Sequence, residues 1–282
     1  MSFKRFLLGA AVVCLAVPFV FLFSAWSPLK TEVSFLDVGQ GDAILIETSK
    51  GRNILIDGGP DRRVVRELSE NLDFGEKTLD LVILTHPHAD HVTGLNSVVE
   101  RFNVKRILLP PVQSQAPAFK HLMDISGKQG VVVATTTAPF SVEMGAGCGL
   151  DVLYPFPDSE FENLNNASLV SRLQCSGLSF LFTGDIEKEA EERILSRDID
   201  LESDILKVSH HGSDSSSGRG FLRAVSPEAA VIPVGEDNDS GHPSLRVIRK
   251  LQREGARILR TDEHGTITIT KEEGEWRVVR EN

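Results

Sequence analysis

The chain has 282 residues, of which 41% are hydrophobic and 25% are charged. A chain of this length can bury one large core, as single-domain α/β proteins of similar size do. Its 40 acidic residues outnumber its 30 Lys and Arg residues, which gives a formal net charge of −10 at pH 7. This balance argues against a general nucleic-acid-binding protein, because phosphate contacts depend on clustered Lys and Arg.

Residues 1–30 are expected to form a separate N-terminal segment. Lys4 and Arg5 give a basic start, and residues 6–26 that follow contain no charge. About 20 apolar residues suffice to cross a bilayer, and this stretch is longer than the apolar part of a typical signal peptide. Because no clean cleavage site follows, we predict an uncleaved signal anchor, with a cleaved secretion signal as the alternative. The basic flank predicts that residues 31–282, the expected folded domain, lie outside the cytoplasmic membrane.

Apolar periodicity divides the rest of the chain into strands and helices. Apolar runs bounded by turn residues predict strands at 33–36, 43–46, 53–56, 79–84, 106–109, 131–133, 178–184, 205–208, 257–259, 266–269 and 276–279, with a further apolar stretch at 227–234. Apolar residues at helical spacing predict helices at 61–72, 91–102, 116–127, 186–197 and 244–254. Strands followed and separated by helices predict a four-layer αββα sandwich, an α/β fold in a single domain.

Polar residues stand at the ends of four of these strands. Three of the chain's eight histidines fall within residues 86–91, shortly after strand 79–84, in the motif His86-x-His88-x-Asp90-His91. Three other strands end in Asp57, in Asp185 and in the pair His210-His211. Imidazole and carboxylate are ligands that suit zinc and similar ions. The alternative is a surface loop rich in histidine and a set of helix-capping carboxylates, which four such strand ends in one chain disfavour.

These motifs resemble those of a known family. The run from His86 to His91, preceded by Asp57 in a Leu-Ile-Asp-Gly-Gly context and followed by Thr183-Gly184-Asp185, resembles the metallo-β-lactamase superfamily. Three further motifs resemble the hydrolase domain at the C-terminus of the ComEC competence proteins, which are DNA-uptake channels, and its free-standing relatives: Leu36-Asp37-Val38-Gly39-Gln40-Gly41-Asp42, Asn165-Asn166-Ala167-Ser168-Leu169-Val170 and His210-His211-Gly212-Ser213. The resemblance covers about residues 32–279 and implies the same αββα fold with a metal-dependent hydrolase activity.

The expected metal ligands serve two divalent ions, Zn or Mn. They are His86 and His88 for the first ion, Asp90, His91 and His211 for the second, and Asp185 as a bridge between the two. Two ions about 3.5–4 Å apart activate a water molecule and stabilise both the attacking and the leaving oxygen of a displacement.

Three further residues are expected to assist the chemistry. Asp57 is expected to orient a ligand as a hydrogen-bond acceptor and not to bind an ion itself. His210 and His242 are candidates to donate a proton to a phosphate oxygen or to the leaving group. The alternative for both histidines is an ordinary core or capping role.

One departure from the superfamily pattern affects the first ion. Most members supply a histidine from the region before Asp185, but this chain has Asn165, Asn166 and Ser168 there and no histidine between His121 and His210. The first site is therefore expected to lack one nitrogen ligand, so that manganese competes with zinc. The departure also argues against lactam hydrolysis. Asn166 or Ser168 is expected to bind the substrate instead.

Cys148 and Cys175 are the cysteines of the expected domain, and neither has zinc-ligand spacing. An exported domain could pair them, but their separation in sequence does not show whether they come within bonding distance. We expect both to be structural and leave the pairing open, with the unpaired state favoured.

The expected function is metal-dependent hydrolysis of a phosphodiester outside the cytoplasmic membrane, with single-stranded DNA during uptake as the substrate and a DNA-uptake channel as a candidate partner. One alternative is hydrolysis of a smaller ester, such as a phosphocholine or nucleotide diester. Another is a non-catalytic, membrane-tethered metal-binding module that assists a separate channel. A basic groove leading to the site would favour the nuclease over the small-ester hydrolase.

Overall fold

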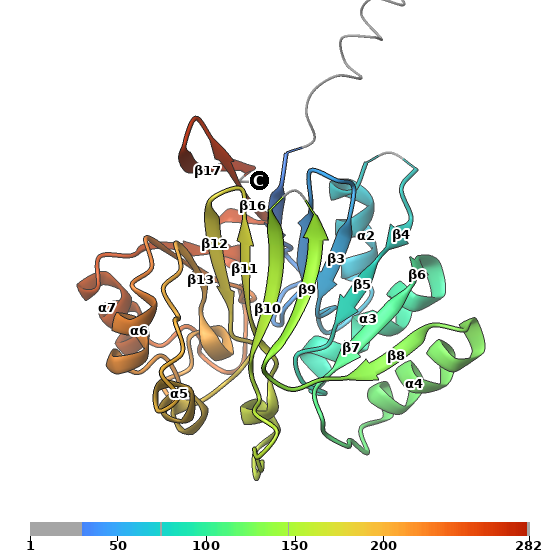
Figure 1. Ribbon diagram of the computed structural model, residues 1–282, viewed down its shortest axis with the longest axis horizontal. Helices are drawn as coiled ribbons and strands as arrows, with labels where there is room; N and C mark the ends of the chain where they lie inside the picture. Colours follow the sequence, from blue (N-terminus) through green and yellow to red (C-terminus); the bar gives the residue numbers. More distant parts are fainter. Residues whose placement is uncertain (1–29, 74, 146, 281–282) are drawn as a thin grey trace, which may run out of the picture.

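Two β-sheets packed face to face form the middle of the molecule (Figure 1). The computed structural model describes residues 30–73, 75–145 and 147–280. In spatial order, the eight-stranded sheet consists of β17 (Glu275–Arg280), β16 (Ile267–Glu272), β1 (Glu32–Phe35), β2 (Ile44–Glu47), β3 (Asn53–Ile56), β5 (Leu81–Ile83), β7 (Arg106–Leu109) and β8 (Val132–Thr135). The seven-stranded sheet consists of β15 (Arg257–Arg260), β14 (Ala229–Ile232), β13 (Ile205–Lys207), β12 (Leu178–Phe182), β11 (Val170–Cys175), β10 (Cys148–Tyr154) and β9 (Phe140–Gly145).

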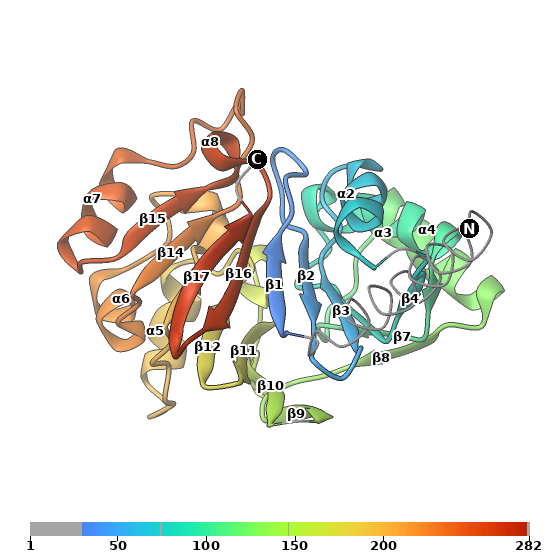
Figure 2. The same ribbon diagram turned by 90° about the horizontal axis from the view of Figure 1, so that it is seen from above.

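Helices cover the outer face of each sheet (Figure 2). The eight-stranded sheet carries α2 (Arg63–Asn71), α3 (Ala89–Arg101) and α4 (Pro117–Gln129), and the other sheet carries α5 (Lys188–Leu195), α6 (Arg219–Val225) and α7 (Leu245–Arg253). The smaller elements are β4 (Thr78–Leu79), β6 (Asn103–Val104), α8 (Thr261–His264) and two short 3-10 helices, η1 (Leu164–Ala167) and η2 (Ser209–Gly212). The arrangement confirms the predicted single-domain αββα sandwich.

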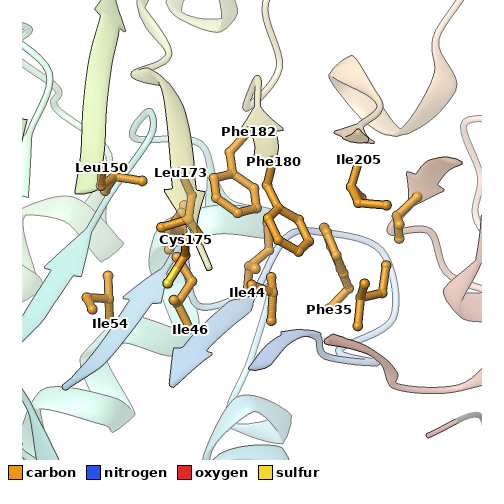
Figure 3. Packing of buried hydrophobic residues seen from close by; sticks show 14 of the residues in the cluster. Phe35, Ile44, Ile46, Ile54, Leu150, Leu173, Cys175, Phe180, Phe182 and Ile205 are labelled. Carbon is orange, nitrogen blue, oxygen red and sulfur yellow. The ribbon is translucent and has the colours of Figure 1, made fainter. Parts of the chain in front are cut away.

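Apolar side chains fill the space between the two sheets (Figure 3). Ile44 and Ile46 of β2 face this inner core, whereas Leu45 between them packs with the helices outside. From the opposite sheet, the ring of Phe182 lies 6.3 Å from that of Phe35. Because each sheet is covered on both faces, its central strands are continuous hydrophobic runs, and this is why the sequence identified them.

The sequence did not predict β9, β10 and β11, which extend the seven-stranded sheet. Strand β10 alternates fully buried and half-buried residues, and Asp151 interrupts its apolar run. This period of two is typical of a strand with one better-covered face. The alternation was the available signal, and a search for continuous apolar runs does not detect it.

The predicted membrane segment, residues 6–26, lies outside the described residues. Within the described part of the chain, no helix has both the length and the apolar character needed to cross a bilayer. The predicted division into residues 1–30 and 31–282 therefore stays a prediction.

Cys148 and Cys175 form a disulfide, with their Cα atoms 4.1 Å apart. The unpaired state favoured from the sequence is wrong, because antiparallel pairing of β10 with β11 brings the two residues together. Thr31 lies against the bond, with its Oγ1 3.3 Å from Sγ of Cys175. Strands β1, β3 and β5 run in the same direction, so Thr31 marks the end of the sandwich at which they begin.

Replacing Cys148 and Cys175 together by alanine should lower the melting temperature of the oxidised protein. A disulfide that closes a loop of this size contributes about 3 kcal/mol to the free energy of unfolding. For a domain this large, that corresponds to roughly 6–12 °C. Calorimetry without reductant measures the shift, and wild-type protein treated with reductant is the control. Equal melting temperatures for variant and wild type would show that the bond adds no stability.

Candidate metal centre

The parallel strands of both sheets end on one side of the sandwich, and polar residues follow them. Strands β3 and β5 run parallel in one sheet, and β12 and β13 run parallel in the other. The loops after these strands carry Asp57, His86, His88, Asp185 and His211, and the first turn of α3 adds Asp90 and His91. Such crevices at the carboxyl ends of strands are where open α/β sheets bind ligands.

Four predicted ligands converge to form one cluster. The ligand atoms of Asp90, His91, Asp185 and His211 all lie within 4.8 Å of one another. Oδ2 of Asp185 is 3.4 Å from Nε2 of His91 and 3.4 Å from Nε2 of His211. Oδ2 of Asp90 is 3.4 Å from the same nitrogen of His211. The residues predicted for the second ion thus surround one small volume.

The imidazoles in this cluster have the hydrogen-bonding pattern of metal ligands. Nδ1 of His91 is hydrogen-bonded to Oδ2 of Asp57 at 2.8 Å, and Nδ1 of His211 to the carbonyl of Pro233 at 2.8 Å. These acceptors place the proton on Nδ1 and turn the Nε2 lone pair toward the cluster. Both Nε2 atoms are buried and, among the described residues, have no hydrogen-bond partner. Buried polar atoms without a partner are rare, so this donor set fits a divalent ion.

His86 and His88, predicted for the first ion, lie beside this cluster. Nε2 of His86 is 3.1 Å from Nδ1 of His88, and the rings of His86 and His91 are 4.2 Å apart. His86 is fully buried, and burial lowers the pKa of its imidazole, which favours the neutral form that binds metals. The geometry brings the two predicted sites together, and the assignment of each residue to an ion stays a prediction.

Asp57 has the contacts expected of an orienting acceptor. Its Oδ1 accepts the backbone N–H of Thr85 at 2.7 Å, and its Oδ2 accepts the Thr85 hydroxyl at 2.6 Å as well as His91. Through these bonds the carboxylate of Asp57 holds the loop that begins at Thr85 and orients His91, a predicted ligand. Asp57 itself has a φ of 59°, a backbone conformation that is costly for a residue other than glycine.

His210 and His242 stand at the rim of the cluster. Nε2 of His210 is 3.9 Å from Oδ2 of Asp185, and its ring centre is 5.6 Å from that of His242. His210 and His211 both have positive φ, 49° and 50°, which aims consecutive imidazoles at the same site at a cost of about 1 kcal/mol or more each. Burial lowers the pKa of both His210 and His242.

Asn166 and Ser168, predicted to bind substrate, make internal hydrogen bonds. The amide of Asn166 donates to Glu189 at 2.8 Å and accepts the N–H of Glu187 at 2.8 Å. Oγ of Ser168 accepts the N–H of Asp185 at 3.1 Å. Both side chains therefore hold the loop that carries Asp185, and their predicted contact with substrate stays a prediction.

The sequence missed three charged residues that border the site. Lys207 is buried at the end of β13 and pairs with Asp42 and Asp185. Glu187 lies 3.3 Å from Nδ1 of His210 and also accepts a hydrogen bond from Asn165. The sequence signal for Lys207 was an ionisable residue inside the apolar run of strand 205–208. Asp42 is the last residue of the motif Leu36–Asp42, whose residues were given no individual role from the sequence.

The site is strongly electronegative. Burial opposes the charge on His91 and His211, but nearby carboxylates, above all Asp185, outweigh it and raise the pKa of His211 to about 10 and that of His91 well above its usual value. Burial also opposes the charge on Asp185, yet His211, His91 and Lys207 hold the pKa of this carboxyl well below its usual value. Protons on the imidazoles thus balance the carboxylates, and a divalent ion would replace those protons.

Metal-free protein should lose stability as the pH rises from about 6.5, the ordinary pKa of histidine, toward the folded-state pKa of His211 of about 10. Because folding raises this pKa, the stabilisation is complete below the unfolded value and is lost as the pH passes the folded value. The melting temperature of chelator-treated protein should fall by roughly 10 °C or more over this range. The melting temperature of zinc-loaded protein should fall less over the same range, since the ion takes the place of the proton on His211. A melting temperature of the chelator-treated protein that does not change with pH over this range would contradict a protonated His211 in the metal-free site.

A metal-ligand cluster at the strand ends of an αββα sandwich defines a class of metal-binding hydrolase folds. The model of the Metallo-beta-lactamase superfamily matches residues 36–236, and the chain belongs to this superfamily. This fold binds divalent metals, often two, and its members are typically metal-dependent hydrolases.

Within the superfamily, two similar proteins belong to the competence proteins. ComE operon protein 3 of Bacillus subtilis is 30% identical over 94% of this chain and 36% of its own length. Competence protein ComA of Neisseria gonorrhoeae is 30% identical over 84% of this chain and 32% of its own length. The chain thus spans about a third of the length of these relatives, which confirm the resemblance to competence proteins.

A solved structure shows the same fold. Igni18, a metallo hydrolase from Ignicoccus hospitalis, superposes with a TM-score of 0.55 at 17% identity and covers 86% of this chain and 100% of its own.

Proposed function

We propose that this protein is a two-metal phosphodiesterase that hydrolyses DNA outside the cytoplasmic membrane. The observation that carries the proposal is the convergence of two unpartnered Nε2 atoms, from His91 and His211, on one oxygen of Asp185. One relative is named a competence protein, and the motifs that resemble ComEC imply DNA uptake; both support DNA as the substrate and a DNA-uptake channel as a partner.

In this proposal, each predicted site residue has a distinct task. Divalent ions, Zn or Mn, would supply an activated water and neutralise charge on the phosphate. His86 and His88 would hold one ion, Asp90, His91 and His211 would hold the other, and Asp185 would bind both. Asp57 keeps His91 in the correct tautomer and orientation. His210 and His242 donate hydrogen bonds to the phosphate or protonate the leaving oxygen, and Asn166 and Ser168 shape the substrate side of the site.

A second candidate is hydrolysis of a small phosphodiester. A pocket of about 320 Å³ adjoins the site through Glu187 and is also lined by Glu160, Glu162 and Glu189. Carboxylates repel the phosphates of a long DNA chain and would favour a small or cationic ester, such as a phosphocholine diester. The same experiment separates the two candidates.

The full chain, purified with Mn or Zn, should cleave single-stranded DNA and bis-p-nitrophenyl phosphate. Asp185→Ala should abolish cleavage and lower the metal content, because it removes the oxygen that faces both ligand imidazoles. His242→Ala should lower kcat about 100-fold or more while keeping the metal, as expected of a proton donor. His121→Ala, a half-exposed histidine near Glu100, is the matched control.

Three outcomes would count against these assignments. Metal-loaded protein that cleaves no diester would overturn the phosphodiesterase. Cleavage of p-nitrophenyl phosphorylcholine but not of DNA would select the small-ester candidate. Loss of an ion from His242→Ala would make His242 a ligand and require a new assignment for His211.

We also propose that residues 6–26 anchor the chain in the cytoplasmic membrane with the hydrolase outside. The uncharged stretch after Lys4 and Arg5 supports an anchor, and a disulfide between Cys148 and Cys175 suits an oxidising compartment. Protease added to spheroplasts should degrade the domain, and membrane fractions should contain the uncut chain. A soluble mature chain beginning near Pro28 would favour the secreted alternative, and protection from protease would reverse the topology.

A further inference from the structure

Lys207 occupies a position that the fold would otherwise give to an apolar residue. It ends β13, and its side chain is buried. Ile205, two residues earlier, belongs to the core between the sheets, and the alternation of side chains along a strand turns Lys207 to the same face. Burying a charge here is costly unless the ammonium group is paired and hydrogen-bonded.

Three oxygens surround this ammonium group. It donates to the carbonyl of Gly184 at 2.7 Å and to Oδ1 of Asp185 at 3.3 Å, and it forms a close ion pair with Asp42. A lysine has three N–H donors, so one acceptor is available for each. The partners come from both halves of the sandwich, since Asp42 precedes β2 and Asp185 follows β12.

The contact with Lys207 makes the two oxygens of Asp185 unequal. Oδ1 faces the ammonium group, whereas Oδ2 faces the Nε2 atoms of His91 and His211 at 3.4 Å each. The backbone of Asp185 is also fixed, because its N–H donates to Ser168. Gly184 permits this approach: a side chain there would meet Cβ of Ser168 at 2.7 Å. The carboxylate therefore cannot easily turn Oδ1 toward the ligand cluster.

We propose that Lys207 is a positioning residue of the metal centre, which holds Oδ1 of Asp185 so that Oδ2 alone is offered to both ions. This inference deepens the proposed function and rests on its two-metal site. A carboxylate that bridges through one oxygen keeps two ions close together, whereas one that bridges through both oxygens spreads them apart. Asp42 balances the charge of Lys207, while the carbonyl of Gly184 and Oδ1 of Asp185 accept the hydrogen bonds that hold the ammonium group beside the cluster.

Lys207→Met tests this role, because methionine retains the length of the side chain and removes the charge. The full chain is titrated with Mn²⁺, and the magnetic coupling between the two ions is followed by electron paramagnetic resonance. In wild-type protein the two ions should be coupled. In the variant, binding of the second equivalent should weaken by about 10–100-fold, and the coupling should diminish because Oδ1 becomes free to bind an ion.

Two companion variants separate positioning from folding. Lys207→Met leaves Asp42 buried without its partner, so the double variant Lys207→Met/Asp42→Asn is measured beside it. Asp42→Asn alone is the matched control: Lys207 keeps its contacts with Gly184 and Asp185, and the coupling should persist.

The result that overturns the proposal is a folded Lys207 variant with wild-type affinity and coupling, even if its melting temperature is lower, since Lys207 would then be purely structural. If neither Lys207 variant folds, the test rests on the wild-type protein. Two bound Mn²⁺ ions that show no magnetic coupling in the wild type would also overturn the proposal. Hydrolysis is not a readout here, so failure of the phosphodiesterase proposal leaves this test intact.

Discussion

Four carboxylates meet at the strand ends, and the architecture of the site depends on what balances their charge. Asp42, Asp57 and Asp185 are buried, and Asp90 is only partly exposed. Such a group of like charges is stable only with cations among them. Among the described residues, the cluster contains the permanent cation Lys207 and two imidazoles, those of His91 and His211, that can hold either a proton or a metal ion. The same electrostatic demand therefore shapes both the metal-free and the metal-loaded protein.

This balance of charge also joins the two sheets. Asp57 and His91 belong to the half built on the eight-stranded sheet, and Asp185 and His211 belong to the other half. In the core between the sheets, around Phe35 and Phe182, the contacts are apolar and nondirectional. At the strand ends the contacts are hydrogen bonds and ion pairs, which are directional. They therefore fix the position of one sheet relative to the other at the candidate metal site.

The sequence predicted the sandwich and the ligands for the same reason. Strands covered on both faces are continuous apolar runs, and a polar residue that ends such a run, such as Asp57 or Asp185, stands out. The roles of Lys207 and Glu187 were missed because they arise from contacts across 20 or more residues, with Asp185 and Asn165 respectively. The disulfide was missed for a similar reason, since only the pairing of β10 with β11 brings its cysteines together.

The direction of β1 has a consequence for a tethered domain. The described chain enters the sandwich at Thr31, beside the disulfide, and the predicted metal ligands follow the opposite ends of β3 and β5. A membrane tether that precedes Thr31 would therefore attach to the end of the sandwich opposite the metal site, so that the opening of the site would face away from the lipid. Such a domain would meet a polymer arriving from outside before that polymer reached the membrane, and it would be poorly oriented toward lipid headgroups beneath it.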